Sequence, residues 1–162
     1  MVKKKKKKLK TGDAWQINSR LIYLVLILIT SAVYANTLFN DYALDDTILI
    51  TENSFTKEGF AGLKDIFSYD TFRGFFGQEG KDKLVSGGRY RPLSQAMFAV
   101  EYALFGKNPF IGHLMNILWY IFLICSLFFI VSQIAENFLK QKSRSLVFSA
   151  IVALIFALHP VH

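Results

Sequence analysis

The sequence predicts an all-α membrane protein with three transmembrane helices and a large outer loop that contains interfacial helices. Three observations predict this fold class. Hydrophobic residues make up 52% of the 162 residues and charged residues only 19%, a balance that excludes a disordered chain. The apolar residues gather in three long runs that lack Asp, Glu, Lys and Arg. The single cysteine excludes both a disulfide framework and a cysteine-ligated zinc site.

The first apolar run covers residues 21–38, the second 111–134 and the third 146–161. As a helix the first run is roughly 27 Å long, close to the ~30 Å hydrocarbon core of a bilayer. The first two runs are apolar all round, whereas the core helix of a soluble domain shows a polar stripe. We expect the first run to be a retained anchor, because its apolar stretch is longer than that of a cleaved signal peptide. The third run is at the short end for a span.

The charges flanking these runs predict the orientation. The basic tail 1–20 and the short connection 135–145 together carry a net charge of +9. The connection 39–110 has eight basic and ten acidic residues, a net charge of −2. The positive-inside rule therefore places the tail and the short connection in the cytoplasm and the long loop outside. The lysine run beside a span sets topology and contacts anionic headgroups of membrane lipids, so we predict no nucleic-acid partner.

Two amphipathic helices are expected in the long loop, both lying at the bilayer surface. Phe60, Leu63, Ile66 and Phe67 have helical spacing. Pro92 suits the first position of a second helix that ends before Gly106. This second helix has one apolar face, formed by Leu93, Ala96, Met97, Val100 and Leu104. Between the two helices, residues 74–88 are rich in glycine and predict a mobile turn region.

Asp45 and Asp46 lie just outside the first predicted span, a few residues after its end. One interpretation is structural: an aspartate that caps a short helix by accepting bonds from free N–H groups. The other is functional: a carboxylate at the membrane surface that acts as a general base or holds a cation. Adjacent helical residues face different directions. We therefore expect one of the two to do the chemistry while the other orients it.

Further polar side chains are predicted near the outer surface. Arg89 and Arg91 precede a helix start and could bind a phosphate, or else pair with loop carboxylates and headgroups. His113 and Asn116 lie three residues apart at the outer end of the second span, which is typical either of a substrate cavity or of a helix–helix hydrogen bond. His159 and His162, at the outer end of the third span, are further candidates for lining this cavity. No spacing among the histidines supports a metal site, so none is predicted.

Several short motifs occur in a fixed order along the chain. They are Tyr42-Ala43-Leu44-Asp45-Asp46, Tyr90-Arg91-Pro92-Leu93-Ser94, Leu104-Phe105-Gly106-Lys107-Asn108-Pro109, His113-Leu114-Met115-Asn116 and Phe156-Ala157-Leu158-His159-Pro160-Val161-His162. In this order they resemble the N-terminal part of the transmembrane and tetratricopeptide-repeat O-mannosyltransferases and their bacterial relatives, which are GT-C glycosyltransferases. The resemblance covers nearly the whole chain after residue 20.

The resemblance implies a multi-span enzyme that moves a mannose-like sugar from a polyprenyl-phosphate donor to a protein or glycan hydroxyl outside the cytoplasm. Its catalytic carboxylate would be Asp46 or Asp45, with a slight preference for Asp46, and Arg89 or Arg91 would bind the donor phosphate. No cofactor is implied with certainty, and a divalent metal stays open because the superfamily varies in this respect. A bacterial inner membrane and the endoplasmic reticulum both fit the predicted topology.

The family's members have many more spans than the three predicted here. We therefore expect this chain to be truncated and incomplete as an enzyme. The alternative is a non-catalytic three-span membrane protein, or an inactive fragment, that binds lipid or a partner protein.

Overall fold

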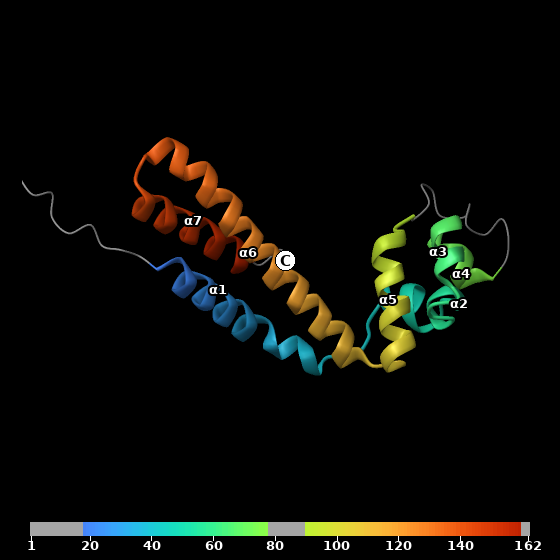
Figure 1. Ribbon diagram of the computed structural model, residues 1–162. Helices are drawn as coiled ribbons and strands as arrows, with labels where there is room; N and C mark the ends of the chain where they lie inside the picture. Colours follow the sequence, from blue (N-terminus) through green and yellow to red (C-terminus); the bar gives the residue numbers. More distant parts are fainter. Residues whose placement is uncertain (1–17, 78–89, 160–162) are drawn as a thin grey trace, which may run out of the picture. The chain divides into compact units, whose positions relative to one another are not determined.

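The computed structural model describes residues 18–77 and 90–159, and the regular elements within these residues are helices (Figure 1). The elements are α1 (Ser19–Tyr34), η1 (Ala35–Phe39), η2 (Thr47–Thr51), α2 (Ser54–Lys57), α3 (Leu63–Ser68), α4 (Thr71–Phe76), α5 (Pro92–Phe105), α6 (Pro109–Leu139) and α7 (Lys142–Ala157). η1 is a 3₁₀ turn and η2 a π-helical turn. The all-α prediction is confirmed for the described part of the chain.

The chain divides into two compact units. The first, called here the bundle unit, comprises Met1–Val33 and Tyr120–His162 and so contains α1, most of α6, and α7. The second, called the loop unit, comprises Tyr34–Trp119 and contains the short helices, α5 and the start of α6.

Two helical segments are long and apolar enough to cross a membrane, and they coincide with the first two predicted spans. They are Ser19–Phe39, which joins α1 to η1, and Pro109–Leu139, which is α6. Only 11% of the apolar window of each segment is buried. A core helix of a soluble protein would bury most of that surface, so the exposed apolar faces fit a lipid environment instead.

The third predicted span is helical, but the structure does not test whether it crosses a membrane. The helix in this region, α7, starts at Lys142, four residues before the predicted span, and ends at Ala157. Its 16 residues are fewer than the roughly 20 that a span usually needs. Residues 160–162 lie outside the described residues. A third span and the orientation of the chain therefore stay predictions.

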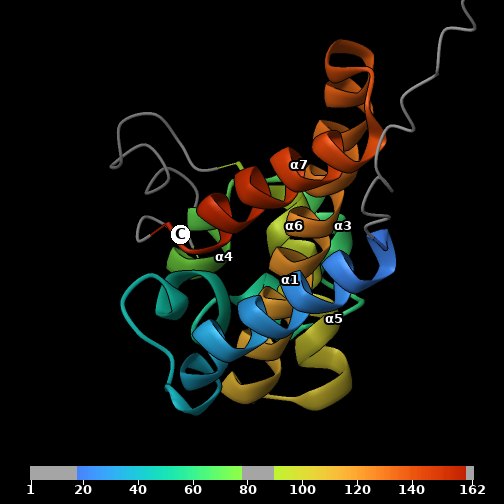
Figure 2. The same ribbon diagram turned by 90° about the vertical axis from the view of Figure 1, so that its left-hand side faces the viewer.

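The helices of the bundle unit pack through one apolar core. Figure 1 and the perpendicular view in Figure 2 both show α1 and α7 alongside the later part of α6. Leu26 of α1 packs with Ile124 and Phe128 of α6, and these contact Leu146, Ala153 and Ala157 of α7. The ring of Tyr23 meets the ring of Phe128 edge to face, with 4.8 Å between centroids.

Small residues allow α7 to approach its neighbours closely. Ser149, Ala153 and Ala157 are fully or almost fully buried, and their spacing of four places them on one face. Small side chains on one face are a common basis of helix packing in membranes, where lipid tails remove the hydrophobic driving force between helices. The hydroxyl of Tyr120 also donates a hydrogen bond of 3.1 Å to the carbonyl of Phe156.

In the loop unit, both predicted amphipathic helices form. The first is α3, which begins at Leu63 rather than at Phe60. The second is α5, with Pro92 in its first turn and Gly106 at its end. Gly106 has a φ of +67°, a left-handed conformation that glycine adopts without steric cost.

The buried face of α5 is not the apolar stripe seen in the sequence. Gln95 and Ala99 are buried, and α5 packs against α2, α3 and η2 through this part of the chain. Leu93 and Leu104, both on the predicted apolar stripe, are 74% and 61% exposed. Gln95 faces inward because its side chain belongs to a buried polar network with Asn53 and Thr71. The location of both helices at the bilayer surface stays a prediction.

The prediction of a turn region over residues 74–88 is wrong for its first residues. Gly74 is buried within α4, and residues 78–89 lie outside the described part. Asp70 starts this helix by accepting a 2.9 Å hydrogen bond from the N–H of Phe72, and Gly77 ends it in a left-handed conformation. Gly74 is required because a Cβ there would overlap the side-chain amide oxygen of Asn53.

A buried polar network joins the helices of the loop unit. The side-chain nitrogen of Asn53 donates to the carbonyl oxygens of Ile48, at 3.0 Å, and Thr71, at 2.9 Å. Its side-chain oxygen accepts from the amide nitrogen of Gln95 at 3.0 Å and from backbone N–H groups at the start of α2. Gln95 in turn accepts a 2.9 Å bond from the hydroxyl of Thr71.

Thr56 completes this network, since its hydroxyl donates to the carbonyl of Leu49 at 2.6 Å. A buried network with its partners present gives one unique packing, whereas any unpaired member is costly. The network therefore holds η2, α2, α4 and α5 together, and with them the segment that carries the predicted carboxylates.

Candidate functional site

The Asp45-Asp46 pair lies in a tight turn between η1 and η2. Asp46 takes the N-cap position of η2, as the structural interpretation expects, but its side chain does not cap that helix. Instead its Oδ2 accepts a 2.9 Å hydrogen bond from the backbone N–H of Ala43, and its own N–H donates to the carbonyl of Ala43 at 3.0 Å. Asp46 is half-buried and Asp45 is exposed. The carboxylate of Asp46 is thus held by the turn that precedes it.

Leu44, inside this turn, has an unfavourable backbone conformation. Its φ is +44° and its side chain is 91% exposed. For a residue with a branched side chain such a φ costs about 1 kcal/mol or more. No burial of the Leu44 side chain compensates for this cost. The two bonds between Ala43 and Asp46 enforce the turn and so position the carboxylate.

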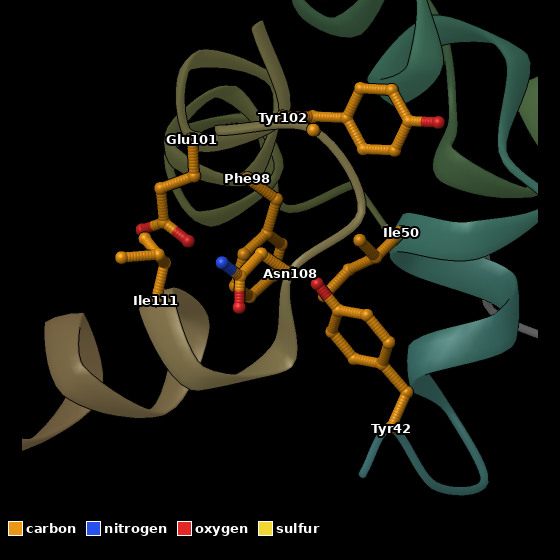
Figure 3. A pocket seen from close by; sticks show the side chains of 8 residues that line it. Tyr42, Ile50, Phe98, Glu101, Tyr102, Asn108 and Ile111 are labelled. Atoms are coloured by element: carbon orange, nitrogen blue, oxygen red, sulfur yellow. The ribbon is translucent and has the colours of Figure 1, made fainter. Parts of the chain in front are cut away.

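A small pocket lies next to this turn within the loop unit (Figure 3). Its volume of about 10 Å³ has room for one water molecule or one hydroxyl group. Figure 3 shows lining residues from two parts of the chain: Phe98, Glu101 and Tyr102 from α5, and Tyr42 from the segment before η2. The rest of the lining comes from Ile50, Gly106, Asn108 and Ile111.

Among the described acids of the loop unit, Glu101 has the most perturbed pKa. Burial raises the pKa of its carboxyl from 4.5 to about 7, because a low-dielectric environment disfavours the charged form. A Cβ on Gly112, in the first turns of α6, would lie 3.9 Å from the Oε2 atom of Glu101. Near neutral pH this carboxyl therefore exchanges its proton easily, a property typical of functional sites.

Tyr42 connects Glu101 with the aspartate turn. Its phenol has a pKa raised first by burial, then by the negative charges of Glu101 and Asp46, and to a smaller extent by Asp41. A backbone hydrogen bond with Asn108 lowers the same pKa. Folding thus adds the negative charge of Glu101, on α5, to those of Asp41 and Asp46, which are close to Tyr42 in the sequence.

Glu101 is not among the site residues predicted from the sequence. A signal was present, since Glu101 is the only charged residue between Pro92 and Phe105 and lies one turn after Met97 on the predicted apolar stripe. An acid beside an apolar face is a candidate for burial. Tyr42 appeared only as part of a motif.

The two predicted phosphate-binding arginines are only partly placed. Arg91 is exposed and takes the N-cap position of α5. Its carbonyl accepts a 3.1 Å hydrogen bond from the hydroxyl of Ser94. The neighbouring Tyr90 donates a 2.8 Å bond to the carbonyl of Phe67, which attaches the start of α5 to α3. Arg89 lies outside the described residues.

The residues of the predicted substrate cavity are divided between the two units of the chain. His113 and Asn116 lie in the part of α6 that belongs to the loop unit. The Nε2 atom of His113 is buried and has no hydrogen-bond partner among the described residues, whereas Asn116 is exposed. His159 belongs to the bundle unit, and His162 lies outside the described residues. The predicted cavity stays a prediction.

The part of the chain that the structure describes contains no cluster of three or more His, Cys, Asp or Glu side chains suited to a metal ion. The carboxylates near Tyr42 act on it through their charge, and they do not form a ligand set.

These features define a helical membrane protein whose first long helix leads into a compact, carboxylate-bearing helical unit. The chain is 31% identical over 146 residues to human protein O-mannosyl-transferase TMTC3, covering 90% of this chain and 14% of the relative. It is 29% identical to the mouse TMTC3 protein, covering 93% of this chain and 15% of the relative. It is 30% identical to human TMTC1, covering 80% of this chain and 13% of the relative.

The resemblance to the transmembrane and tetratricopeptide-repeat O-mannosyltransferases, predicted from the motifs, is therefore confirmed. The chain spans about one seventh of the length of these curated relatives. No family model matches the chain, and no solved structure matches it significantly.

Proposed function

We propose that this chain forms the N-terminal, carboxylate-bearing portion of a GT-C glycosyltransferase. The enzyme would move a mannose-like sugar from a polyprenyl-phosphate donor to a protein or glycan hydroxyl on the extracytoplasmic side of the membrane. The similarity to proteins named as O-mannosyl-transferases, over 80–93% of this chain, carries the proposal. The position of Asp45 and Asp46, a few residues beyond the helical segment Ser19–Phe39, supports it.

The position of the aspartates suits a lipid-linked donor. Such a donor keeps its prenyl tail in the bilayer and its phosphate at headgroup level. The base that serves it must therefore lie just beyond the end of a span. The position of Asp46, a few residues after the segment Ser19–Phe39, fits this requirement, and the N–H of Ala43 holds one of its carboxylate oxygens.

In the proposed step, the carboxylate of Asp46 takes the proton of the acceptor hydroxyl. The acceptor oxygen forms a bond to the anomeric carbon of the sugar as the bond from that carbon to the phosphate oxygen breaks. Polyprenyl phosphate leaves with the electron pair of the broken bond. Arg91, and Arg89 with it, would stabilise the negative charge that develops on the phosphate.

The test uses the protein as its gene encodes it, in membranes supplied with radiolabelled polyprenyl-phosphate mannose and a Ser/Thr-containing acceptor peptide. We expect Asp46→Asn to reduce label transfer at least about 100-fold, the usual effect of losing a general base. Asp45→Asn should reduce it less. Glu58→Gln is the matched control, because Glu58 is an exposed carboxylate of the same loop unit.

Full transfer by both aspartate variants would contradict the assignment of the base. Absence of transfer by the unmodified protein with every polyprenyl-phosphate sugar tried would instead favour the non-catalytic alternative.

A further inference from the structure

The bundle unit contains a second, larger pocket that the proposed transfer does not use. Its volume is about 300 Å³, within the range of small-molecule sites. Tyr23 and Phe128 form part of its apolar wall, and Glu136, Gln133, Lys142 and Ser145 are among its polar lining.

This pocket lies where the apolar segments meet the polar ends of the helices. Ser19 at the start of α1, Glu136 near the end of α6 and Lys142 at the start of α7 all line it. Both views show the start of α1 and the turn between α6 and α7 toward one end of the bundle unit (Figures 1 and 2). If α1 and α6 span the membrane, this level is that of the lipid headgroups.

The pocket presents one positive and one negative side chain. Lys142 and Glu136 both line it, yet within the described residues they form no ion pair with each other. The first turn of α7 also lines the pocket, and Gln141 at its N-cap makes no side-chain capping bond. A helix N-terminus beside a lysine favours a phosphate group, while a carboxylate favours an ammonium group.

From this juxtaposition we infer that the pocket binds the headgroup of phosphatidylethanolamine, with the phosphate at Lys142 and the primary ammonium at Glu136. The ammonium supplies N–H donors that the carboxylate can accept. Phosphatidylcholine carries the same phosphate, but its quaternary ammonium has no N–H to donate. Phosphatidylglycerol lacks a cation for Glu136 and brings its negative charge near that carboxylate.

Exposed cations beside the pocket define the competing possibility. Arg20, Lys140 and Arg144 are exposed near the same helix ends. A basic surface alone attracts anionic lipids without regard to the headgroup's shape. The two possibilities differ in the role of Glu136, which only a zwitterionic headgroup with N–H donors would use.

Native mass spectrometry of the full chain, released from detergent with equal amounts of the three lipids, tests the inference. We expect phosphatidylethanolamine to be retained more than phosphatidylcholine and phosphatidylglycerol. Glu136→Gln should lower its retention at least about fivefold, the effect of losing a charge-assisted hydrogen bond. It should leave phosphatidylglycerol unchanged or better retained. Lys142→Gln should lower the retention of both phosphatidylethanolamine and phosphatidylglycerol.

Two exposed loop-unit residues provide matched controls, Glu58→Gln and Lys107→Gln, and circular dichroism checks that each variant keeps its helix content. Equal retention of phosphatidylethanolamine and phosphatidylcholine would overturn the inference, as would unchanged retention in a folded Glu136→Gln variant. Preferred retention of phosphatidylglycerol would assign the surface to anionic lipids instead. If free phosphoethanolamine at equal concentration displaces phosphatidylethanolamine, the ligand need not be a membrane lipid. The headgroup chemistry of the pocket would then stand, and the lipid assignment would be overturned.

Discussion

Replacement of Asn53 by aspartate should lower the stability of the loop unit without changing its packing. The two side chains have the same size, so packing is preserved. The side-chain nitrogen of Asn53 donates to the buried carbonyls of Ile48 and Thr71, and a carboxylate oxygen cannot. Asn53 itself is fully buried, so water does not replace these bonds without opening the structure.

The magnitude follows from the two bonds that are lost. Each buried carbonyl left without a partner costs about 1–3 kcal/mol. An ionised carboxylate at this position would add repulsion between its charge and these carbonyls, and the pKa of the introduced carboxyl would rise in response. If the carboxyl takes up a proton, one of the two bonds returns. We therefore expect a loss of about 3–4 kcal/mol in the stability of the loop unit, at the upper end of ordinary point mutations.

Hydrogen exchange followed by mass spectrometry measures this change in the full chain, held in lipid nanodiscs. At about 1.4 kcal/mol for each factor of ten, protection in peptides from η2, α2 and α4 should fall about 100- to 1,000-fold. Asn40→Asp is the matched control, because Asn40 is exposed. A fall of less than tenfold would refute the role of the network. An equal fall in α7 would show a general effect and would refute its local origin.

Two further predictions concern the same unit. As pH rises from about 4.5 to about 7, the unfolded chain loses the proton of Glu101 before the folded chain does, so the stability of the loop unit should fall over this window and then level off. Glu101→Gln should remove that fall. The measurement is the hydrogen-exchange protection of α5 at several pH values, corrected for intrinsic exchange rates. If protection depends on pH in the same way in both proteins, the assignment to Glu101 is contradicted. Gly62→Ala should destabilise the unit by about 1–3 kcal/mol or more, because a Cβ there would overlap the carbonyl oxygen of Phe55. In a urea titration its effect should exceed that of Gly112→Ala, where the nearest atom to the added Cβ is Oε2 of Glu101 at 3.9 Å; the reverse order would be evidence against this packing.

Glu101, whose pKa is raised, and the strained Leu44 belong to the same unit as the proposed base. Both features reduce stability, and natural proteins tolerate such costs mainly at functional sites. The polar network around Asn53 and Gln95 offsets them by holding η2, α2, α4 and α5 in one arrangement. The rigid part of the loop unit thus supports a turn whose own conformation is unfavourable.

The motif Tyr90-Arg91-Pro92-Leu93-Ser94 has a structural role at the start of α5. Pro92 begins α5, and Tyr90 and Ser94 attach its first turn through bonds to the carbonyls of Phe67 and Arg91. The residue after this motif, Gln95, then reaches the network. The motif therefore orients α5, which also carries Glu101.

The sequence by itself determined the class of protein, the first two long apolar helices and the bounds of α5. Each of these depends on neighbouring residues: apolar length for the spans, Pro92 and Gly106 for the ends of α5. It also pointed to Asp45 and Asp46, because their position after an apolar run is visible in the chain.

Only the tertiary structure decided which face of α5 is buried and which acid is perturbed. Gln95 faces inward because Asn53 and Thr71 supply its partners from distant positions in the chain. Glu101 becomes unusual because folding brings it into the pocket that Tyr42 lines. Periodicity describes one helix at a time, whereas burial and pKa depend on what the fold places opposite each side chain.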